Sequence, residues 1–537
     1  MSLLLLLAAC GRLDAEGSDA DVGSRPTYFL ALITRPSGTG AAPADYEPYA
    51  LALTPVATDE RVALRTSPQR GWLNGTLSPR YALDAGRHAD LQAHAARLRR
   101  AGPSPQQRTA RRLAGCGCDA AHFCVRGSCV TQASLVLPDG GSGADTTAIT
   151  VNLVAVVPTA VAPIDVLLDA ASDSPAMRLA VLDVVQRFAS TWPLELNLLA
   201  QVGHTGALDH DQDGRLAVAF SAARGQVAPQ IFAQTQGFFS FLDLGPAGPA
   251  TATSSGNGRD LIWLRPPGSD ASTTALQLIG TLAHEYTHLV QAAVRAFGGS
   301  RALSQVPEAL WLEEGMAHLM EDLTGWGASN VDTVAAALAA WSTGSFASDQ
   351  DSPAQRGRTY LLLRHMLDSR ARAAGAHEAD DAVTRLAAGR MLRDLLQEAQ
   401  AGFEHQQFVD LGIDGLFAWL TALYATGNPE VRRGDAHRAD YLAQSTSPLT
   451  QQRVGLAPYG TITNALGQTF SLQGPQDVTA LEALAPVVRG VLPTAGSKLF
   501  TVQSIDALTP TLREARANPM GPYLRLQQIA GVDAPTN

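Results

Sequence analysis

Hydrophobic residues follow two different spacings along the chain, and the change falls near residue 270. Before it, short apolar and β-branched runs bounded by turn residues predict strands. These predicted strands cover residues 28–34, 46–56, 149–157, 194–202, 215–221 and 261–264. Two predicted helices lie among them, an Arg-rich one over 86–101 and one that follows Ser174, which suits an N-cap and precedes Pro175.

After residue 270, apolar residues recur at the spacing of one buried helix face. The predicted helices cover 270–297, 307–323, 331–341, 354–372, 380–400 and 415–424, and strand-like pieces follow at 459–472 and 498–504. Strands followed by helices are typical of the α+β class. We therefore expect an α+β domain over 144–430, a small N-terminal domain over 27–143 and a small C-terminal domain over 431–537.

The composition is that of a globular protein with more than one domain. The chain has 537 residues, of which 46% are hydrophobic and 17% are charged, and this is too apolar for a disordered chain. The formal net charge of -10 argues against a nucleic-acid partner, because phosphate binding needs a basic face.

The first ten residues, MSLLLLLAAC, form an apolar run that ends in a cysteine. The ending Leu7-Ala8-Ala9-Cys10 resembles the lipobox of bacterial lipoproteins, which implies a lipid on Cys10 and makes residues 1–26 a signal and tether. The run is too short for a membrane-spanning helix, which needs about 20 apolar residues. No Lys or Arg precedes it, unlike most export signals, and a buried strand is the alternative. We expect a protein of the bacterial cell envelope, at the outer membrane, periplasm or cell surface, or a secreted one.

Four further cysteines, Cys116, Cys118, Cys124 and Cys129, lie in one short segment. In the oxidising compartment that an exported protein meets, they can form two disulfides, whose connectivity the sequence leaves open. A structural zinc site is the alternative, but such sites usually pair cysteines as CxxC or wider, and the first pair here is CxC. We expect disulfides.

The most specific chemical signal is His284-Glu285-Tyr286-Thr287-His288, an HExxH motif inside a predicted helix. Residues four apart lie on one face of a helix, so both imidazoles can bind the same metal ion, and Glu285 lies beside them to act on a water at the metal. The alternative is a chance match on a surface helix. A zinc peptidase also needs a third protein ligand.

A second motif supplies that ligand by resemblance. Trp311-Leu312-Glu313-Glu314-Gly315-Met316-Ala317 resembles the WLNEG segment of gluzincins, whose Glu is the third zinc ligand, and this implies that Glu314 binds zinc with His284 and His288. Over residues 148–427 the chain resembles the hyicolysin family of bacterial metallopeptidases. Other segments that carry this similarity are 209–214, 237–239 with Asp243, 257–264 and 360–367. The resemblance implies a thermolysin-like domain with Zn²⁺ as cofactor.

The resemblance also implies roles for residues around the zinc. Thermolysin-like gluzincins carry an Asp one turn after the ligand Glu, but this chain has His318 there, which would orient a zinc ligand, be an alternative ligand, or be a core histidine. Glu321 and Asp322 could supply the missing carboxylate. Gluzincins commonly take their oxyanion donor from a following helix, which indicates Tyr360, with packing as the alternative role. The strand over 261–264 either binds substrate along its edge or serves the fold alone.

Asp209, Asp211, Asp213 and Gly214 have the DxDxDG spacing of a calcium loop. Phe220 stands at the loop position where an EF-hand carries Glu, and this excludes an EF-hand. A calcium loop of another kind and a solvated turn are both open, so Ca²⁺ is a second candidate cofactor.

These features together predict a zinc-dependent endopeptidase that cuts proteins or peptides outside the cytoplasm and touches a membrane only through its N-terminal lipid. Glu285 would act as the base. An aminopeptidase would need acidic residues for the substrate N-terminus, and no GxMEN-like segment is present. The alternative of another class is a catalytically degraded lipoprotein that binds peptides or matrix, which the intact motif disfavours.

Overall fold

The computed structural model describes most of the chain between residues 147 and 476 and short segments on either side. The described ranges are 27–33, 46–52, 118–119, 121–125, 128–137, 147–206, 208–211, 213–222, 236–244, 257–269, 273–295, 308–347, 352–398, 402–425, 441–442, 444–476, 479–481, 488–493, 497–503, 511–513 and 523–528. Cys10, Cys116 and the predicted helix over 86–101 lie outside them. In the described part of the chain, no helix is long and apolar enough to cross a membrane.

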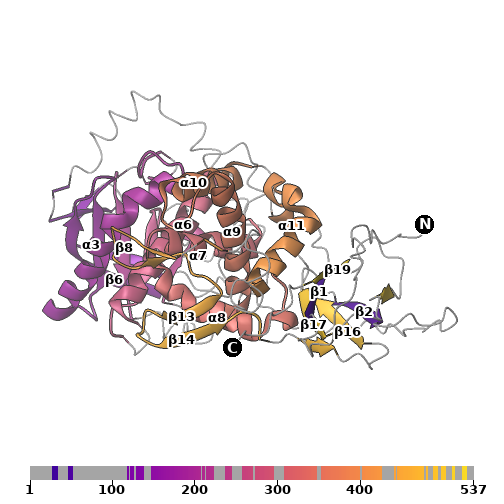
Figure 1. Ribbon diagram of the computed structural model, residues 1–537. Helices are drawn as coiled ribbons and strands as arrows, with labels where there is room; N and C mark the ends of the chain where they lie inside the picture. Colours follow the sequence, from indigo (N-terminus) through magenta and orange to yellow (C-terminus); the bar gives the residue numbers. More distant parts are fainter. Residues whose placement is uncertain are drawn as a thin grey trace, which may run out of the picture.

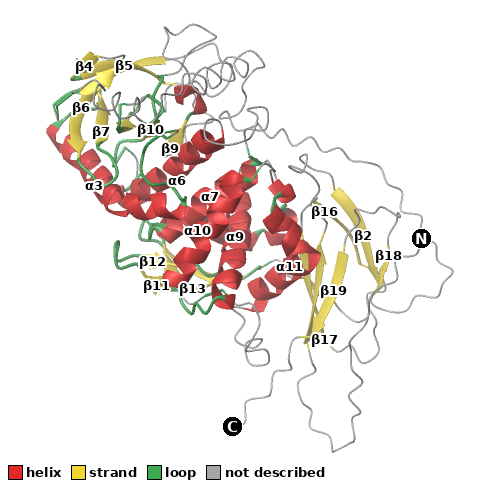
Figure 2. Ribbon diagram, turned by 90° about the horizontal axis from the view of Figure 1, so that it is seen from above, coloured by secondary structure: helices red, strands yellow, loops and turns green. Residues whose placement is uncertain are grey.

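A six-stranded mixed sheet forms one end of the molecule (Figure 2). Its strands, in spatial order, are β5 (Gln132–Leu137), β6 (Thr147–Val157), β7 (Ile164–Asp169), β8 (Leu216–Phe220), β10 (Leu261–Leu264) and β9 (Gly237–Phe239). The strands β7, β8 and β10 run parallel, and the other neighbouring pairs are antiparallel. The predicted strands 149–157, 215–221 and 261–264 are confirmed, and β7 was not predicted.

Apolar residues cover both faces of this sheet, so its central strands contain continuous apolar runs. In β8, Leu216, Val218 and Phe220 belong to the larger core, and Ala217 and Ala219 belong to a smaller core on the opposite face. The larger core continues into α3 (Pro175–Leu198) and α6 (Ala275–Ala293), which lie between the sheet and the other helices (Figure 2).

The predicted strand over 194–202 is wrong, because residues 194–198 form the last turns of α3. Ser174 caps this helix as predicted, since its side chain accepts a hydrogen bond from Met177 N (3.2 Å). The apolar alternation of the last turns is typical of a strand. The helical pattern prevails because Trp192 and Leu196, four residues apart, are both buried in the core.

The helical part follows the predicted order. Its members are α6, α7 (Leu310–Leu323), α8 (Val331–Ala339), α9 (Pro353–Ala373), α10 (Ala382–Gln397) and α11 (Gln406–Ala425). Most ends lie within a few residues of the prediction, and α11 begins earlier than predicted because it continues across a kink at Gly412. A mixed sheet followed by helices is compatible with the α+β class.

The two ends of the chain share two further sheets. In one, β1 (Thr27–Ile33) lies between β17 (Ser497–Gln503) and β19 (Tyr523–Gln528), and in the other, β2 (Tyr46–Ala52) lies between β16 (Val488–Pro493) and β18 (Thr511–Arg513). Figure 1 shows these N-terminal and C-terminal strands together beside α11. The sequence predicts a small N-terminal domain over 27–143 and a small C-terminal domain over 431–537, and in the structure strands from these two ranges pair with each other.

Residues 444–476 pack on the helical part. The hairpin of β13 (Tyr459–Thr463) and β14 (Thr469–Gln473) lies next to α8, and Gly455 N donates to Asp322 Oδ1 of α7 (2.8 Å). This segment belongs structurally with the helices rather than with the terminal strands.

The cysteine segment forms the short hairpin of β3 (Phe123–Val125) and β4 (Ser128–Val130). A disulfide joins Cys118 to Cys129, with 5.4 Å between their Cα atoms, and Cys124 is also disulfide-bonded. The predicted disulfide chemistry is confirmed for these residues, and this bridge uses up two of the thiolates that the alternative zinc site would need.

Candidate metal centre

The helices α6 and α7 bring His284, His288 and Glu314 together in the interior. The Nε2 atom of His284 lies 3.2 Å from Glu314 Oε2 and 3.1 Å from His288 Nε2, and His288 Nε2 lies 3.6 Å from Glu314 Oε1. One ligand atom from each residue falls within 4.8 Å of the others, so this group could hold a metal ion. All three residues are at most 4% exposed.

The surroundings of His284 favour a positive charge. Burial lowers the pKa of this imidazole, but its hydrogen bonds to Glu314 and Glu321 have the larger effect and raise the pKa to about 9. Burial raises the pKa of Glu321, yet His318 and His284 bring it down to about 2, so this carboxylate stays ionised. Two imidazoles and the Glu314 carboxylate are a donor set that suits a divalent cation, and Glu321 adds a second negative charge behind His284.

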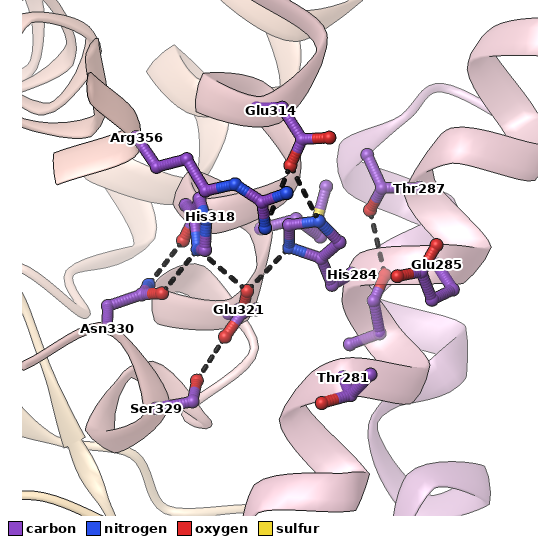
Figure 3. Close-up of polar contacts among 12 residues, drawn as sticks. Thr281, His284, Glu285, Thr287, Glu314, His318, Glu321, Ser329, Asn330 and Arg356 are labelled. Atoms are coloured by element: carbon purple, nitrogen blue, oxygen red, sulfur yellow. Dashed lines mark hydrogen bonds and ion pairs between the residues drawn. The ribbon is translucent and has the colours of Figure 1, made fainter. Parts of the chain in front are cut away.

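Glu321 holds the rings of two histidines. Its Oε1 contacts His284 Nδ1 (2.6 Å) and His318 Nδ1 (2.9 Å), and its Oε2 accepts from Ser329 (Figure 3). Asn330 also contacts His318, since its Oδ1 lies 2.6 Å from Nδ1 and its Nδ2 donates to the His318 carbonyl (2.7 Å). Glu321, rather than Asp322, therefore contacts His284, a member of the candidate metal-binding group.

His318 takes a place beside His284 but outside the His284–His288–Glu314 group. The ring centroids of His284 and His318 are 4.6 Å apart. His284, His318 and Glu321 form a second group whose ligand atoms lie within 4.8 Å of one another. Because the Nδ1 atoms of both rings face the same Glu321 oxygen, this second group is a hydrogen-bonded cluster that orients the imidazoles.

Glu285 is held by the sheet. It is buried, and its Oε2 accepts a hydrogen bond from Phe239 N in β9 (2.8 Å). Gly237 lets β9 come this close to α6, because a Cβ at this position would lie 2.5 Å from Thr281 Cγ2. This hydrogen bond restricts the orientation of the carboxylate next to His284.

Tyr360 does not take the predicted place at the centre. Its side chain is fully buried, and its hydroxyl donates to Asp322 Oδ2 (2.9 Å), which also accepts from Arg364 Nη1 (2.7 Å). One helical turn earlier, Arg356 Nη1 lies 3.2 Å from Glu314 Oε2. The sequence offered one signal for Arg356, its position four residues before Tyr360 on the same face of the predicted helix.

The predicted substrate edge over 261–264 is wrong, because β10 pairs with β8 on one side and β9 on the other. Among the described strands, β9 lies at the end of the sheet. The sequence did not indicate β9 as the neighbour of β10, because β9 has only three residues. A short apolar run also carries no information about strand order.

The aspartate loop forms part of a second buried charged cluster. Asp209 and Asp211 join Asp260 in a group that could hold a cation, and the sequence did not indicate Asp260. Asp213 instead pairs with Arg259 (3.0 Å), which also contacts Asp211 (3.3 Å). Burial and the neighbouring Asp211 raise the pKa of Asp213 to about 7. A guanidinium therefore already neutralises part of this cluster.

Comparisons with known proteins give no assignment: no protein-family model matches the chain, and no curated protein matches it.

Proposed function

We propose that this chain is a gluzincin-type zinc metallopeptidase with a thermolysin-like catalytic domain, and that it hydrolyses peptide bonds in proteins outside the cytoplasm. The observation that carries the proposal is the convergence of His284, His288 and Glu314, whose ligand atoms lie within 4.8 Å of one another. Glu285 follows His284 in the sequence and is buried on the same helix. Two imidazoles and one carboxylate match the ligand set of catalytic zinc sites, which leave a fourth position open.

The hydrogen bond between Glu321 and His284 also supports zinc as the metal at this site. Glu321 accepts from His284 Nδ1, which leaves the Nε2 lone pair for a metal, and a carboxylate behind a histidine is the usual partner of zinc-binding imidazoles. When bound, a zinc ion supplies a Lewis acid that acidifies a water and polarises a carbonyl.

The proposed roles of the protein groups follow from their contacts. Glu285 accepts the proton of the attacking water and then passes it to the leaving amine. Phe239 N holds this carboxylate in one orientation, so little reorganisation is needed when the proton moves. Among the described strands, β9 is the last of the sheet, and an extended peptide that adds to this end of the sheet would lie next to Glu285.

The lipobox-like ending at Cys10 supports a place in the bacterial cell envelope, where the substrates would be extracytoplasmic proteins.

The test of the proposal combines metal content with cleavage of casein. We expect Glu285→Gln to keep its zinc while hydrolysis falls at least about 100-fold, because the amide cannot accept a proton. We expect Glu314→Ala to lose zinc affinity and activity together, because two histidines remain. Glu404→Ala, at an exposed carboxylate, is the matched control.

Two results would contradict the proposal. A parent protein that binds zinc but cleaves nothing, with Glu285→Gln indistinguishable from it, would make the chain a binding module. Full zinc in Glu314→Ala together with its loss in His318→Ala would show that the third ligand is His318.

A further inference from the structure

Arg356 lies where the buried metal centre meets the surface. Its side chain is 21% exposed, whereas that of Glu314 is 3% exposed, and their Nη1 and Oε2 atoms are 3.2 Å apart. Figure 3 shows the guanidinium beside Glu314 and His318, on the side of the centre opposite Glu285. A permanent cation thus lies next to a proposed ligand, close to the place where the reacting carbonyl would be polarised.

The contact between α7 and α9 fixes the position of Arg356. Ser352 caps α9, with its Oγ accepting from Gln355 N (3.2 Å), so Arg356 stands in the first turn. On the same face, Tyr360 and Arg364 both bind Asp322 of α7. These two hydrogen bonds fix the rotation of α9 about its own axis, and in this orientation Arg356 faces Glu314.

The guanidinium of Arg356 is suited to stabilise a negative charge. It carries five N–H groups in a fixed planar fork, and it stays charged at every working pH. Negative charge that develops on an oxygen beside Glu314 is therefore attracted by this cation. Tyr360, the residue that the sequence indicated for this role, is committed to Asp322.

We propose that Arg356 is a catalytic residue that donates hydrogen bonds to the oxygen of the scissile carbonyl as negative charge develops on it. This inference rests on the peptidase function proposed above. The water oxygen bonds to the carbonyl carbon, and the π pair of the carbonyl moves to its oxygen, where Arg356 stabilises it. When the C–N bond breaks, this pair re-forms the carbonyl, and Glu285 delivers the proton to the amine. Arg356 gains and loses no proton.

The decisive variants are Arg356→Gln and Arg356→Lys, measured on a peptide with blocked ends. We expect kcat to fall about 100- to 1,000-fold in Arg356→Gln, the usual effect of removing an oxyanion donor, with KM changed far less. Affinity for a phosphonate analogue of the tetrahedral intermediate should fall in parallel. Arg356→Lys should recover part of both, because the charge remains while the fork is lost.

Zinc affinity of the metal-free protein, titrated against a chelator, is the readout that does not depend on activity. It should stay the same or rise in Arg356→Gln, because a cation beside Glu314 is removed. Arg370→Gln, near the other end of α9, is the matched control, since Arg370 binds Gln407 (2.6 Å) instead of the centre. Thermal unfolding checks that each variant is folded.

Three outcomes would overturn the inference. Loss of zinc in Arg356→Gln would make Arg356 a residue that positions Glu314. Unchanged kcat and unchanged phosphonate affinity would remove it from the reaction. A defect with free-acid peptides but none with amidated ones would mean that Arg356 binds a substrate C-terminus. A parent that binds no zinc and cleaves no peptide refutes the proposed function itself and is thereby distinguishable from all three.

Discussion

At the scale of single residues, orientation at the centre depends on Glu321. One of its oxygens contacts Nδ1 of both His284 and His318, and the other accepts from Ser329. A ring whose Nδ1 donates to a carboxylate presents the Nε2 lone pair to a metal. The three hydrogen-bonding partners of Glu321 therefore restrict the orientation of its carboxylate. That carboxylate in turn restricts the ring orientation of His284, a proposed zinc ligand.

We predict that Glu321→Gln weakens zinc binding about 10- to 100-fold, because the neutral amide is a poorer acceptor for two imidazole N–H groups. The measurement is competition for zinc with a chelator of known affinity. Glu404→Gln, an exposed carboxylate on a short 3₁₀ helix, is the control. Equal affinity in Glu321→Gln and the parent would show that this carboxylate does not orient the ligand.

His365 gives the fold a defined pH dependence. Burial, with Arg372 nearby, lowers the pKa of this imidazole from 6.5 to about 4, so it is neutral when the protein is folded at neutral pH. The unfolded chain binds the proton first as pH falls, and the contribution to stability is thus complete above pH 6.5 and is lost towards pH 4.

We predict that this residue alone removes up to about 3 kcal/mol of stability between neutral pH and about pH 4. His365→Gln, which cannot take up a proton, should show a shallower decline of the unfolding free energy over this window in denaturant titrations. The exposed His377→Gln is the matched control. An identical decline in His365→Gln and the parent would contradict the assignment.

At the scale of elements, the contact between α7 and α9 connects the fold to the centre. Gly315, next to Glu314, faces Thr359 and Leu363, and a Cβ there would lie 2.4 Å from Thr359 Cγ2 and 3.0 Å from Leu363 Cδ1. A glycine is needed because the two helices approach too closely for any side chain. This approach brings Arg356 of α9 against Glu314 of α7.

We predict that Gly315→Ala destabilises the protein, because overpacking costs about 1–3 kcal/mol and the helix propensity of alanine returns at most about 1 kcal/mol. Adding Thr359→Ser should restore most of the loss, since it removes Cγ2 and keeps the hydroxyl that donates to Phe346 O (2.9 Å). Denaturant unfolding of both variants and of Thr359→Ser alone is the measurement. A double variant no more stable than Gly315→Ala would argue against this contact.

At the scale of the whole molecule, the ends of the chain depend on each other. Both N-terminal strands are central, since β1 lies between β17 and β19 and β2 lies between β16 and β18. Without them, four C-terminal strands lose a partner for their backbone hydrogen bonds.

We predict that deleting residues 1–52 makes the region 488–528 sensitive to limited proteolysis. The zinc binding that we propose for α6 and α7 should persist. Deletion of residues 1–26 alone, which keeps both strands, is the control. Mass spectrometry of the fragments locates the cuts. Equal resistance of the region 488–528 in the two proteins would contradict the strand pairing.

Elements whose pattern is local can be predicted from the sequence alone. The helix α6 and its HExxH motif follow from spacing within a single segment, because residues four apart share a face of any helix. The same holds for the cap at Ser174 and for the strands β6, β8 and β10.

The neighbours of those elements depend on how the helices and strands pack together. Successive residues on a helix point about 100° apart, so the choice of Glu321 over Asp322 depends on how α7 is rotated against α6 and α9. Packing of the same helices turns Tyr360 towards Asp322 and leaves Arg356 at Glu314. Strand order in the six-stranded sheet depends on contacts between residues tens of positions apart, and the pairing of the two chain ends depends on contacts hundreds of positions apart. No local pattern carries that information.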